Sequence, residues 1–404
     1  MERAELATLL GHRGGPTGTV QAVVVAESHP GKFREAFARA VAGRGPVFLA
    51  DPRWGDRERR QFDALVVQSA VDGVERGWLA IPTGGSSGQI KLARHDEQTL
   101  AAAVAGFRAH FGFAEINAVG VLPLHHVSGL MAWLRGALSG GHYLPADWKR
   151  LAEGQLPAID KTRQWTLSLV PTQLASLLPS EEAVAWLRGF QAVLVGGGSA
   201  WAPLLEIARE REIPLAPSYG STETAAMVAA LRPSEFLSGA EGSGPVMPHA
   251  KVTIESDALI TVRSEALYRG YWPNGCEEAY WCGGDLGRWG NAGSLIITGR
   301  ADRLITSGGE KVNPMEIEVL LRGLPGGESA VVLGVPDDRW GERVVVCVPP
   351  GSRLGLIRVH QALEGSVAAF KWPKTLHVVD PWPSSEAGKV NHGALRHSVI
   401  QGGA

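Results

Sequence analysis

Short apolar runs alternate with helix-like stretches through about the first 250 residues of the chain. The apolar runs predict buried strands at Val47–Ala50, Ala118–Leu124, Thr166–Val170, Ala192–Val195 and Ile213–Ala216. Segments with helical spacing of apolar residues lie between them at Lys32–Ala42, Asp96–Phe111 and Leu204–Arg211. This alternation is typical of largely parallel sheets flanked by helices, so we expect an α/β fold.

The pattern changes after about residue 250, where short β-like runs are separated by Gly, Pro and Asp turns. These runs predict a small β-rich subdomain over about residues 250–300. Further on, Asn313-Pro314 is typical of a helix start, with Asn313 as the cap and Glu316 reaching back to it. The remaining predicted elements are helices Pro314–Leu321 and Ile357–Phe370 and strands Ser329–Val335, Arg343–Val348 and Thr375–Val379. We expect a large N-terminal domain over residues 1–301 and a small α+β C-terminal domain over residues 302–404.

The composition excludes several classes of protein. The formal net charge of the 404 residues is −2, which gives no global basic field for nucleic acid or an anionic membrane. No apolar run reaches the roughly 18 residues of a membrane span, and the start of the chain lacks the apolar segment of a signal peptide. The three cysteines form no CxxC pair, so we expect neither a disulfide framework nor a zinc knuckle. We expect a soluble, cytoplasmic protein with no nucleic-acid partner and no integral membrane segment.

The first candidate site is a glycine-rich segment that ends in a basic residue. Glycines let the backbone bend around an anion, while hydroxyl groups and a lysine supply donors and charge. The segment contains Thr83, Gly84, Gly85, Ser86, Ser87, Gly88 and Lys91. It lacks the Walker A spacing, and a surface loop is the alternative interpretation.

Two further candidate segments follow predicted strands. A carboxylate beside a hydroxyl suits Mg²⁺, and an aromatic ring can stack on a purine. The segment with these groups contains Ser218, Tyr219, Gly220, Thr222 and Glu223. Gly197 and Gly198 follow another strand, where the lack of side chains permits close approach of a flat ring. Turns without a ligand are the alternative for both segments.

Later segments carry single groups that suit a nucleotide. Asp285 can accept hydrogen bonds from ribose hydroxyls, and Arg300 can donate to ribose or phosphate; hairpin turns are the alternative. The glycine turn Ser307-Gly308-Gly309 lets a thin ligand pass closely, and Lys389 lies in a polar loop.

Two adjacent histidines, His125 and His126, follow an apolar run. Neighbouring residues on a strand point to opposite faces of a sheet. We therefore expect these histidines not to form a chelating pair.

Taken in order, these segments resemble the adenylate-forming superfamily, which includes acyl- and aryl-CoA synthetases, peptide-synthetase adenylation domains and luciferases. Residues 83–91 are similar to its phosphate loop, 219–223 to YGxTE and 284–285 to TGD. Residues 299–318 resemble GRxDxxIxxGGExVxPxEIE, 335–342 resemble VPDxxxGE, and 388–389 resemble the C-terminal GK. The resemblance covers roughly residues 80–390.

Within this superfamily the chain is most similar to the o-succinylbenzoate–CoA ligases of menaquinone and phylloquinone biosynthesis. Leu122–Gly129 resembles their LPLxHVSG motif, and Val170–Leu174 resembles VPTQL. The chain departs from the superfamily pattern at Gly84, where Ser is usual, at Ile90, where Pro is usual, and at Gly283, where Thr is common.

The resemblance implies two half-reactions at one site that uses ATP, Mg²⁺ and CoA. A carboxylate first attacks the α-phosphate of ATP, and the CoA thiol then displaces AMP from the acyl-adenylate. Residues 83–91 would bind phosphates, and Thr222 and Glu223 would serve phosphate and Mg²⁺. Gly197, Gly198, Ser218 and Tyr219 would frame adenine, and Asp285 and Arg300 would hold ribose.

The resemblance also implies that the C-terminal domain rotates about Asp302 between the two half-reactions. Lys389 would bridge the carboxylate and the α-phosphate during adenylation only. The turn at Ser307, Gly308 and Gly309 would then reach the tunnel for the CoA arm. His126 would line or gate the acyl pocket, with a packed structural histidine as the alternative.

Other functions stay open at this point. The chain is also compatible with an aryl- or fatty-acyl-CoA ligase for another acid, with an adenylation domain that loads a carrier protein, or with a non-catalytic nucleotide-binding relative. The charges of Glu223, Asp285, Arg300 and Lys389 argue against the last of these. The oligomeric state, a homodimer included, is also open.

Overall fold

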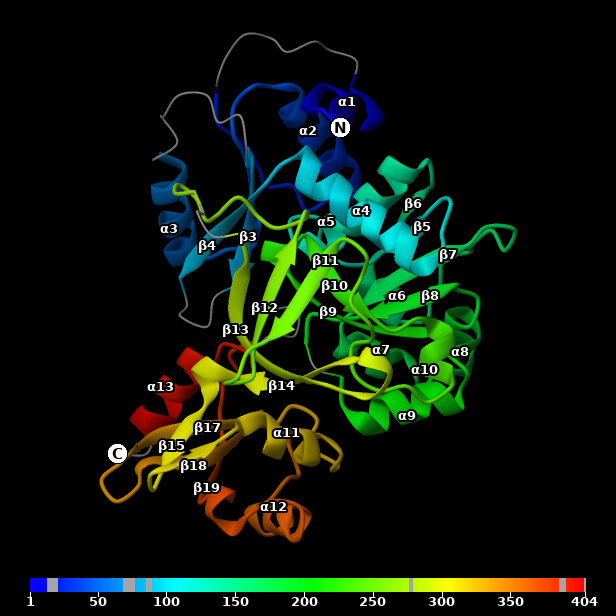
Figure 1. The fold of residues 1–404 in the computed structure, drawn as a ribbon. Helices are drawn as coiled ribbons and strands as arrows, with labels where there is room; N and C mark the ends of the chain where they lie inside the picture. The colour runs from blue at the N-terminus through cyan, green and yellow to red at the C-terminus, as the bar shows by residue number, and fades with distance from the viewer. Residues whose placement is uncertain are drawn as a thin grey trace.

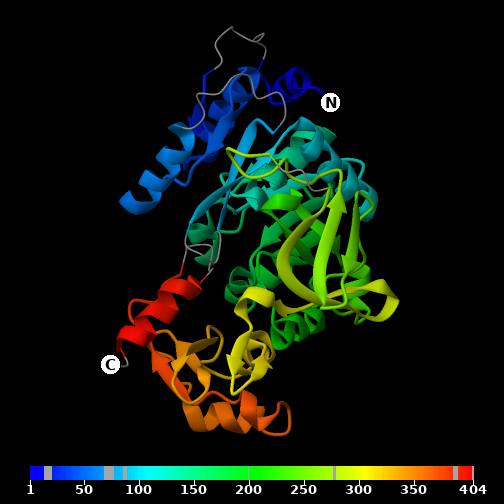
Figure 2. The ribbon, with the colours of Figure 1, turned by 60° about the vertical axis from the view of Figure 1, so that its left-hand side comes forward.

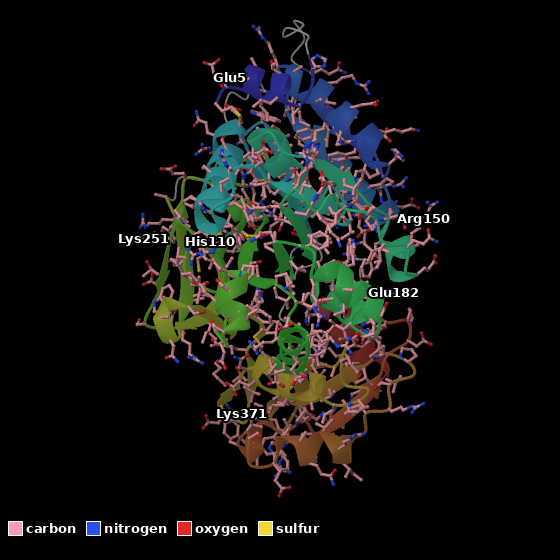
Figure 3. All side chains as sticks on the ribbon, turned by 90° about the vertical axis from the view of Figure 1, so that its right-hand side faces the viewer. Glu5, His110, Arg150, Glu182, Lys251 and Lys371 are labelled. Carbon is pink, nitrogen blue, oxygen red and sulfur yellow. The ribbon has the colours of Figure 1, made fainter. Side chains whose placement is uncertain are left out.

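The computed structural model describes residues 1–12, 21–67, 77–84, 89–198, 200–275, 279–384 and 390–402. Four β-sheets follow one another along the chain: the first lies toward the N-terminal end of the molecule, the second and third lie side by side in its middle, and the fourth lies at the opposite end (Figure 1). Glu5 lies near one end of this elongated shape and Lys371 near the other (Figure 3). No helix among the described residues is long and apolar enough to cross a membrane.

The first sheet has the order β1-β2-β3-β4, with β1 to β3 parallel and β4 antiparallel to β3. Its strands are β1 (Val23–Val25), β2 (Val47–Leu49), β3 (Leu79–Gly84) and β4 (Ile90–His95). The helices of this part are α1 (Arg3–Leu9), α2 (Pro30–Ala42), α3 (Asp56–Val67) and α4 (Glu97–Phe111). Helix α4 begins where the Asp96 carboxylate accepts from the Thr99 amide, and it ends at Gly112, which adopts a left-handed conformation.

The second sheet has six strands in the order β10-β9-β8-β7-β5-β6, parallel except for β10. Its strands are β5 (Asn117–Gly120), β6 (Tyr143–Pro145), β7 (Trp165–Leu169), β8 (Ala192–Val195), β9 (Leu215–Ser221) and β10 (Ala226–Ala230). The helices are α5 (Val127–Ser139), α6 (Trp148–Ala152), α7 (Pro171–Leu177), α8 (Glu181–Leu187), α9 (Ala202–Glu210) and α10 (Pro233–Leu237). Apolar clusters cover both faces of this sheet, and one of them continues into the first sheet.

The third sheet is antiparallel and packs against the β9–β10 edge of the second. It consists of β11 (Ala250–Ile254), β12 (Leu259–Ser264), β13 (Trp281–Trp289) and β14 (Leu295–Arg300), with a 3₁₀ turn at Asn291–Gly293. The β-rich region predicted over about residues 250–300 is therefore confirmed.

The fourth sheet lies at the C-terminal end of the molecule (Figures 1 and 2). It consists of β15 (Ile305–Ser307), β16 (Glu310–Val312), β17 (Val331–Asp337), β18 (Gly341–Val348) and β19 (Thr375–Val378). The helices are α11 (Pro314–Arg322), α12 (Leu356–Leu363) and α13 (His392–Gly402). Helices α11 and α12 pack on one apolar face of the sheet, and α13 packs on the other. The expected α/β class is thus confirmed for the whole chain.

The expectation of largely parallel sheets is confirmed for the first two sheets, in which β4 and β10 are antiparallel to their neighbours. Some predicted local features were wrong. The helix predicted over Ile357–Phe370 ends at Leu363; Gly365 has a φ of +74°, and residues 369–371 form a separate 3₁₀ turn. The Asn313 cap is confirmed, but Glu316 pairs with Lys371 Nζ at 2.5 Å instead of reaching back.

Candidate active site

Three strands bring together a tyrosine, an aspartate and an arginine that lie far apart in the sequence. Tyr219 Oη on β9 donates to Asp285 Oδ2 on β13 at 2.9 Å. Arg300 Nη1, at the end of β14, donates to Asp285 Oδ1 at 3.1 Å. The antiparallel pairing of Asp285 with Arg300 fixes the second contact. These three predicted nucleotide-binding residues therefore form one hydrogen-bonded group.

Arg300 also holds the residue predicted as the hinge. Its Nε and Nη2 donate to the two carboxylate oxygens of Asp302, each at 2.9 Å, and Nη2 donates to Gly283 O at 3.0 Å. Hydrogen bonds to Asp302 raise the pKa of Arg300. Burial raises the pKa of Asp285 despite the opposing charge of Arg300, and burial together with the Asp285 charge raises the pKa of Tyr219.

Glu223 lies in a 3₁₀ turn, Thr222–Thr224, immediately after β9, and only 6% of its surface is exposed. Its Oε1 accepts from Tyr271 Oη at 2.6 Å, and its backbone carbonyl accepts from the Tyr268 amide at 2.8 Å. Burial raises the pKa of Tyr271, and the Glu223 charge adds to this effect, so the phenol stays a donor. Oε2 accepts no hydrogen bond from any residue that the structure describes.

His95 was not singled out in the sequence, yet it positions the Thr222–Glu223 turn. Its Nε2 lies 2.8 Å from Thr222 O, to which it donates, and its Nδ1 lies 3.1 Å from Thr99 Oγ1. Burial lowers the pKa of His95 to about 4, so the ring is neutral near pH 7. The next residue, Asp96, is held by an ion pair with Arg269 at 2.8 Å.

The glycine-rich segment begins on β3 and returns on β4. Thr83 and Lys91 are paired across these strands, as are Gly84 and Ile90. Lys91 Nζ lies 5.1 Å from the centre of the Tyr271 ring, whose hydroxyl holds Glu223. The predicted phosphate-binding lysine and the predicted Mg²⁺ ligand are thus joined through one tyrosine. Gly85, Ser86, Ser87 and Gly88 lie outside the described residues.

The glycines predicted to frame adenine have different structural roles. Gly197 follows β8 with a φ of +75°, and a Cβ built at Gly198 meets no described atom within 4 Å beyond its chain neighbours. Ser218 Oγ, on the neighbouring strand, lies 3.3 Å from Val195 O and faces this turn. In contrast, a Cβ at Gly220 would lie 1.8 Å from Ala226 O. Gly220 is therefore required by the close β9–β10 pairing, whatever ligand binds.

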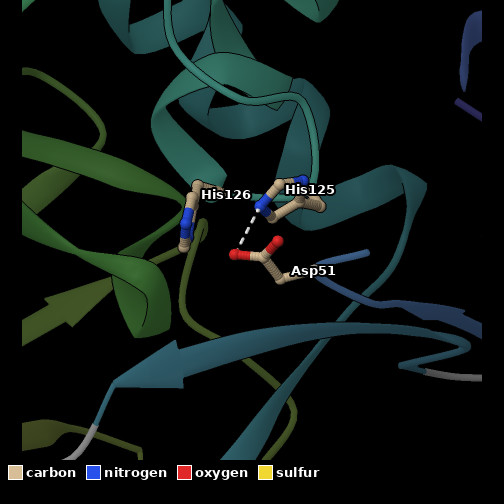
Figure 4. Close-up of side chains that lie close together, drawn as sticks. All are labelled: Asp51, His125 and His126. Atoms are coloured by element: carbon tan, nitrogen blue, oxygen red, sulfur yellow. Dashed lines mark ion pairs between the residues drawn. The ribbon is translucent and has the colours of Figure 1, made fainter. Parts of the chain in front are cut away.

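The strand that was expected to point His125 and His126 to opposite faces is wrong, because these residues do not lie on a strand. Strand β5 ends at Gly120, and His126 is the N-cap of α5. In this turn both histidine rings lie close to Asp51, which follows β2 (Figure 4). The centroids of the His125 and His126 rings are 4.6 Å apart. Burial would raise the pKa of Asp51, but His125 and Arg53 outweigh it and hold that pKa well below its usual range.

The C-terminal site residues are placed only in part. Ser307 ends β15, and Gly308 and Gly309 form the turn to β16 with φ values of +61° and +85°. The Gly308 amide donates to Trp340 O at 2.8 Å. Lys389 lies outside the described residues, so the structure does not test its position.

Chemically, the described groups can bind a polyanion and a hard cation side by side. Glu223 and Thr222 offer oxygen ligands of the kind Mg²⁺ prefers, and Arg300 and Lys91 offer positive charge. Tyr271 holds the Glu223 carboxylate in place, and His95 holds the Thr222 carbonyl. Neither residue could be predicted from the sequence, because Tyr271 and His95 lie far along the chain from Glu223 and only the fold brings them to its turn.

Comparison with known families identifies the chain. Residues 66–272 match the model of AMP-binding enzymes, and residues 316–389 match the AMP-binding enzyme C-terminal domain. The chain belongs to the AMP-binding enzyme family. The expected likeness to adenylate-forming enzymes is thereby confirmed.

Two relatives of this AMP-binding enzyme cover different shares of it. A 2-succinylbenzoate–CoA ligase of Listeria monocytogenes serotype 4b is 31% identical over 287 residues, 69% of this chain and 61% of that ligase. An indoleacetate–CoA ligase of Aromatoleum aromaticum is 32% identical over 393 residues, 91% of this chain and 76% of that ligase. The chain thus spans less than two thirds of the Listeria relative.

Solved structures share the fold. The o-succinylbenzoate CoA synthetase of Bacillus subtilis, in complex with its acyl-adenylate intermediate, has a TM-score of 0.78 at 21% identity; the match covers 98% of this chain and 91% of that one. ATP-bound MatB from Rhodopseudomonas palustris has a TM-score of 0.75, also at 21% identity, with 98% and 92% covered.

Proposed function

We propose that this AMP-binding enzyme is an ATP-dependent acid–thiol ligase. It joins a carboxylic acid to CoA through an acyl-adenylate and releases pyrophosphate and then AMP. The observation that carries the proposal is the meeting of Tyr219, Asp285 and Arg300 from three strands, next to the buried Glu223. A carboxylate and a guanidinium at one strand end suit a ribose, and the adjacent glycine turn suits a flat base.

In the proposed first half-reaction, the chain acts by positioning and by charge. The substrate carboxylate is already the nucleophile, so no side chain has to remove a proton from it. Gly197, Gly198 and Ser218 border adenine with Tyr219, and Asp285 holds the ribose. Lys91 and the segment around it stabilise the phosphates, and Lys389 bridges the carboxylate and the α-phosphate.

The described residues fit the Mg²⁺ that accompanies ATP. The Glu223 carboxylate is buried, and Tyr271 occupies only Oε1. Thr222 is held in place through its carbonyl by His95. Mg²⁺ takes one or two oxygen ligands from the protein and fills its other positions with phosphate oxygens and water, so these two donors suit it, and the ion would neutralise phosphate charge.

We propose that the chain works as two domains, residues 1–301 and 302–404, that change orientation about Asp302. Arg300 is tied to Asp285 on one side of this residue, and Arg303 is paired with the buried Glu318 on the other. The backbone between these two anchors is the shortest segment that can absorb a rotation. Rotation would withdraw Lys389 and bring the turn at Ser307, Gly308 and Gly309 to the CoA arm.

For the acid we propose 2-succinylbenzoate, which would place the enzyme in menaquinone biosynthesis. Support comes from the Leu122–Gly129 and Val170–Leu174 motifs and from the Listeria relative. In this proposal His126 borders the acyl pocket at the start of α5. An aryl-acetic acid is the second candidate, because the indoleacetate–CoA ligase aligns over 91% of the chain.

Acid-dependent exchange of labelled pyrophosphate into ATP tests the adenylation step. We expect exchange in the wild type and a loss of at least about 100-fold in Asp285→Ala, since the ribose contact and the Arg300 partner are both removed. Asp257→Ala is the matched control, because Asp257 is an exposed carboxylate in the same sheet region. Equal exchange in both variants would contradict the assignment of Asp285, and no exchange with any acid would contradict the ligase.

A further inference from the structure

Asp51, His125 and His126 form a compact cluster where the first and second sheets meet (Figure 4). One ligand atom from each residue lies within 4.8 Å of the other two. We propose that these three side chains bind a transition-metal ion, Zn²⁺ by preference, separate from the Mg²⁺ that accompanies ATP. This inference goes beyond the ligase reaction, although His126 would belong both to the metal site and to the border of the proposed acyl pocket.

The geometry of the pair His125–Asp51 already fits a metal. His125 Nε2 lies 3.2 Å from Asp51 Oδ2. Two ligands of a tetrahedral Zn²⁺, each bound at about 2.0–2.1 Å, are about 3.3 Å apart. His126 must move closer by at most about 1.5 Å, which rotation of its ring about the side-chain bonds can supply.

The imidazole of His125 lacks the hydrogen bond that a purely structural histidine would have. His125 is 4% exposed, and its buried Nε2 has no hydrogen-bond partner among the residues that the structure describes; its contact with Asp51 Oδ2 is an ion pair at 3.2 Å. A buried nitrogen of this kind is costly unless another group uses it. A metal ion between this nitrogen and the carboxylate would satisfy the nitrogen.

The donor set selects the type of ion. Two imidazole nitrogens and one carboxylate oxygen suit Zn²⁺, Co²⁺ or Ni²⁺, whereas Mg²⁺ and Ca²⁺ prefer oxygen ligands. Three protein ligands leave a fourth position for water or for a small oxygen donor.

Arg53 competes with the metal for Asp51. Its Nη2 donates to Oδ2 at 2.8 Å, and its Nε and backbone amide donate to Oδ1 at 2.9 and 3.0 Å. The side chain of Arg53 is 36% exposed, so the guanidinium can turn toward solvent when a cation approaches. The backbone amide can stay on Oδ1 and keep the carboxylate oriented, as outer hydrogen bonds commonly do at metal sites.

Metal titration of the full chain, purified without a histidine tag and stripped with a chelator, tests the proposal. We expect about one equivalent of Co²⁺ per chain with the visible absorption of a four-coordinate ion, and its displacement by Zn²⁺. His125→Gln and Asp51→Asn should each weaken Zn²⁺ binding at least tenfold. Arg53→Met should strengthen it about tenfold, since the competing cation is gone.

His397→Gln is the matched control, because this histidine is exposed on α13 and should leave the affinity unchanged. Thermal unfolding with and without Zn²⁺ separates lost ligands from lost folding: Zn²⁺ should raise the Tm of the wild type and of His397→Gln but not of folded His125→Gln. Absence of a saturable equivalent in the wild type would overturn the proposal. So would equal affinity of His125→Gln and His397→Gln, or an affinity that falls in Arg53→Met.

Discussion

His95 is a buried imidazole at the end of β4 that links the predicted phosphate-binding segment to the Thr222–Glu223 turn. The residue is 0% exposed, and its ring donates to Thr222 O at 2.8 Å. Because burial lowers its pKa to about 4, the folded protein keeps this ring neutral at pH values where a histidine in the unfolded chain is charged. The residue therefore couples the stability of the site to pH.

We predict that His95 makes the folded state less stable in acid. Between pH 6.5 and about pH 4, the unfolded chain binds a proton at this residue and the folded chain does not, so stability falls as the pH falls. The full effect is about 3 kcal/mol. Urea unfolding at several pH values should show that the wild type loses more stability in this window than His95→Gln. An identical pH dependence of the two proteins would contradict the assignment, and His397→Gln serves as the control.

At the residue scale, sequence motifs located those site residues that lie within a recognisable local pattern. Tyr219, Asp285 and Arg300 were each predicted from local pattern, and the structure brings them together. Tyr271 and Asp51 were missed because neither lies in a segment that a local motif singled out, and only the fold places each beside its partner. For His125 and His126 the error lay in the expected strand, which ends before them.

At the scale of elements, the β9–β10 pairing shapes the candidate nucleotide site. The two strands approach so closely at Gly220 that a side chain there would overlap the Ala226 carbonyl. Ala225 and Ala226 have φ values of 51° and 87°, which are strained for residues with a side chain and lie directly beyond the Glu223 turn. The turn is thus forced by its strands into one conformation.

Two glycines of the predicted nucleotide-binding segments, Gly220 and Gly198, should respond differently to the same substitution. Gly220→Ala should lower the free energy of unfolding by about 2 kcal/mol or more, because backbone atoms must move apart. Gly198→Ala should change it by less than about 0.5 kcal/mol, since a Cβ there meets no atom within 4 Å. Chemical denaturation of both variants checks this. A stable Gly220→Ala protein would show that the strand pairing tolerates a side chain.

Periodicity predicted buried strands well where apolar runs are short and bounded by turns. Strand β8, Ala192–Val195, has the predicted limits, and α2 and α4 differ from prediction by a residue or two. The strand predicted over Ala118–Leu124 ends at Gly120 in the structure. The apolar residues after it lie in a turn, where Leu124 is buried. The antiparallel direction of β10 could not be predicted, since direction depends on the chain reversal at Glu223 and not on the apolar pattern.

At the scale of the whole molecule, the proposed hinge lies between two charge networks. Arg300 joins Asp302 to Asp285, and Glu318, 1% exposed, accepts from both Arg303 and Arg322. The second network stays within the C-terminal part, so a rotation at Asp302 need not break it. The hydrogen bonds between Arg300 and Asp302 join residues at the proposed hinge itself.

We predict that Lys389→Ala separates the two half-reactions. The variant should lose acid-dependent pyrophosphate exchange by at least about 100-fold, because the positive charge on the α-phosphate is removed. Transfer of the acyl group to CoA from a supplied acyl-adenylate should be nearly unchanged, since the proposed rotation would withdraw Lys389 in that step. Equal loss of both half-reactions would contradict domain alternation about Asp302.

The central claim is that the chain activates 2-succinylbenzoate as a CoA thioester. The most direct measurement is CoA-dependent AMP release from Mg·ATP with 2-succinylbenzoate, indoleacetate, benzoate, 2-hydroxybenzoate, octanoate and acetate. The account predicts that kcat/KM for 2-succinylbenzoate exceeds the others by about 100-fold, or about 2.7 kcal/mol of transition-state discrimination. A higher kcat/KM for any other acid, or AMP release that does not depend on CoA, would contradict it.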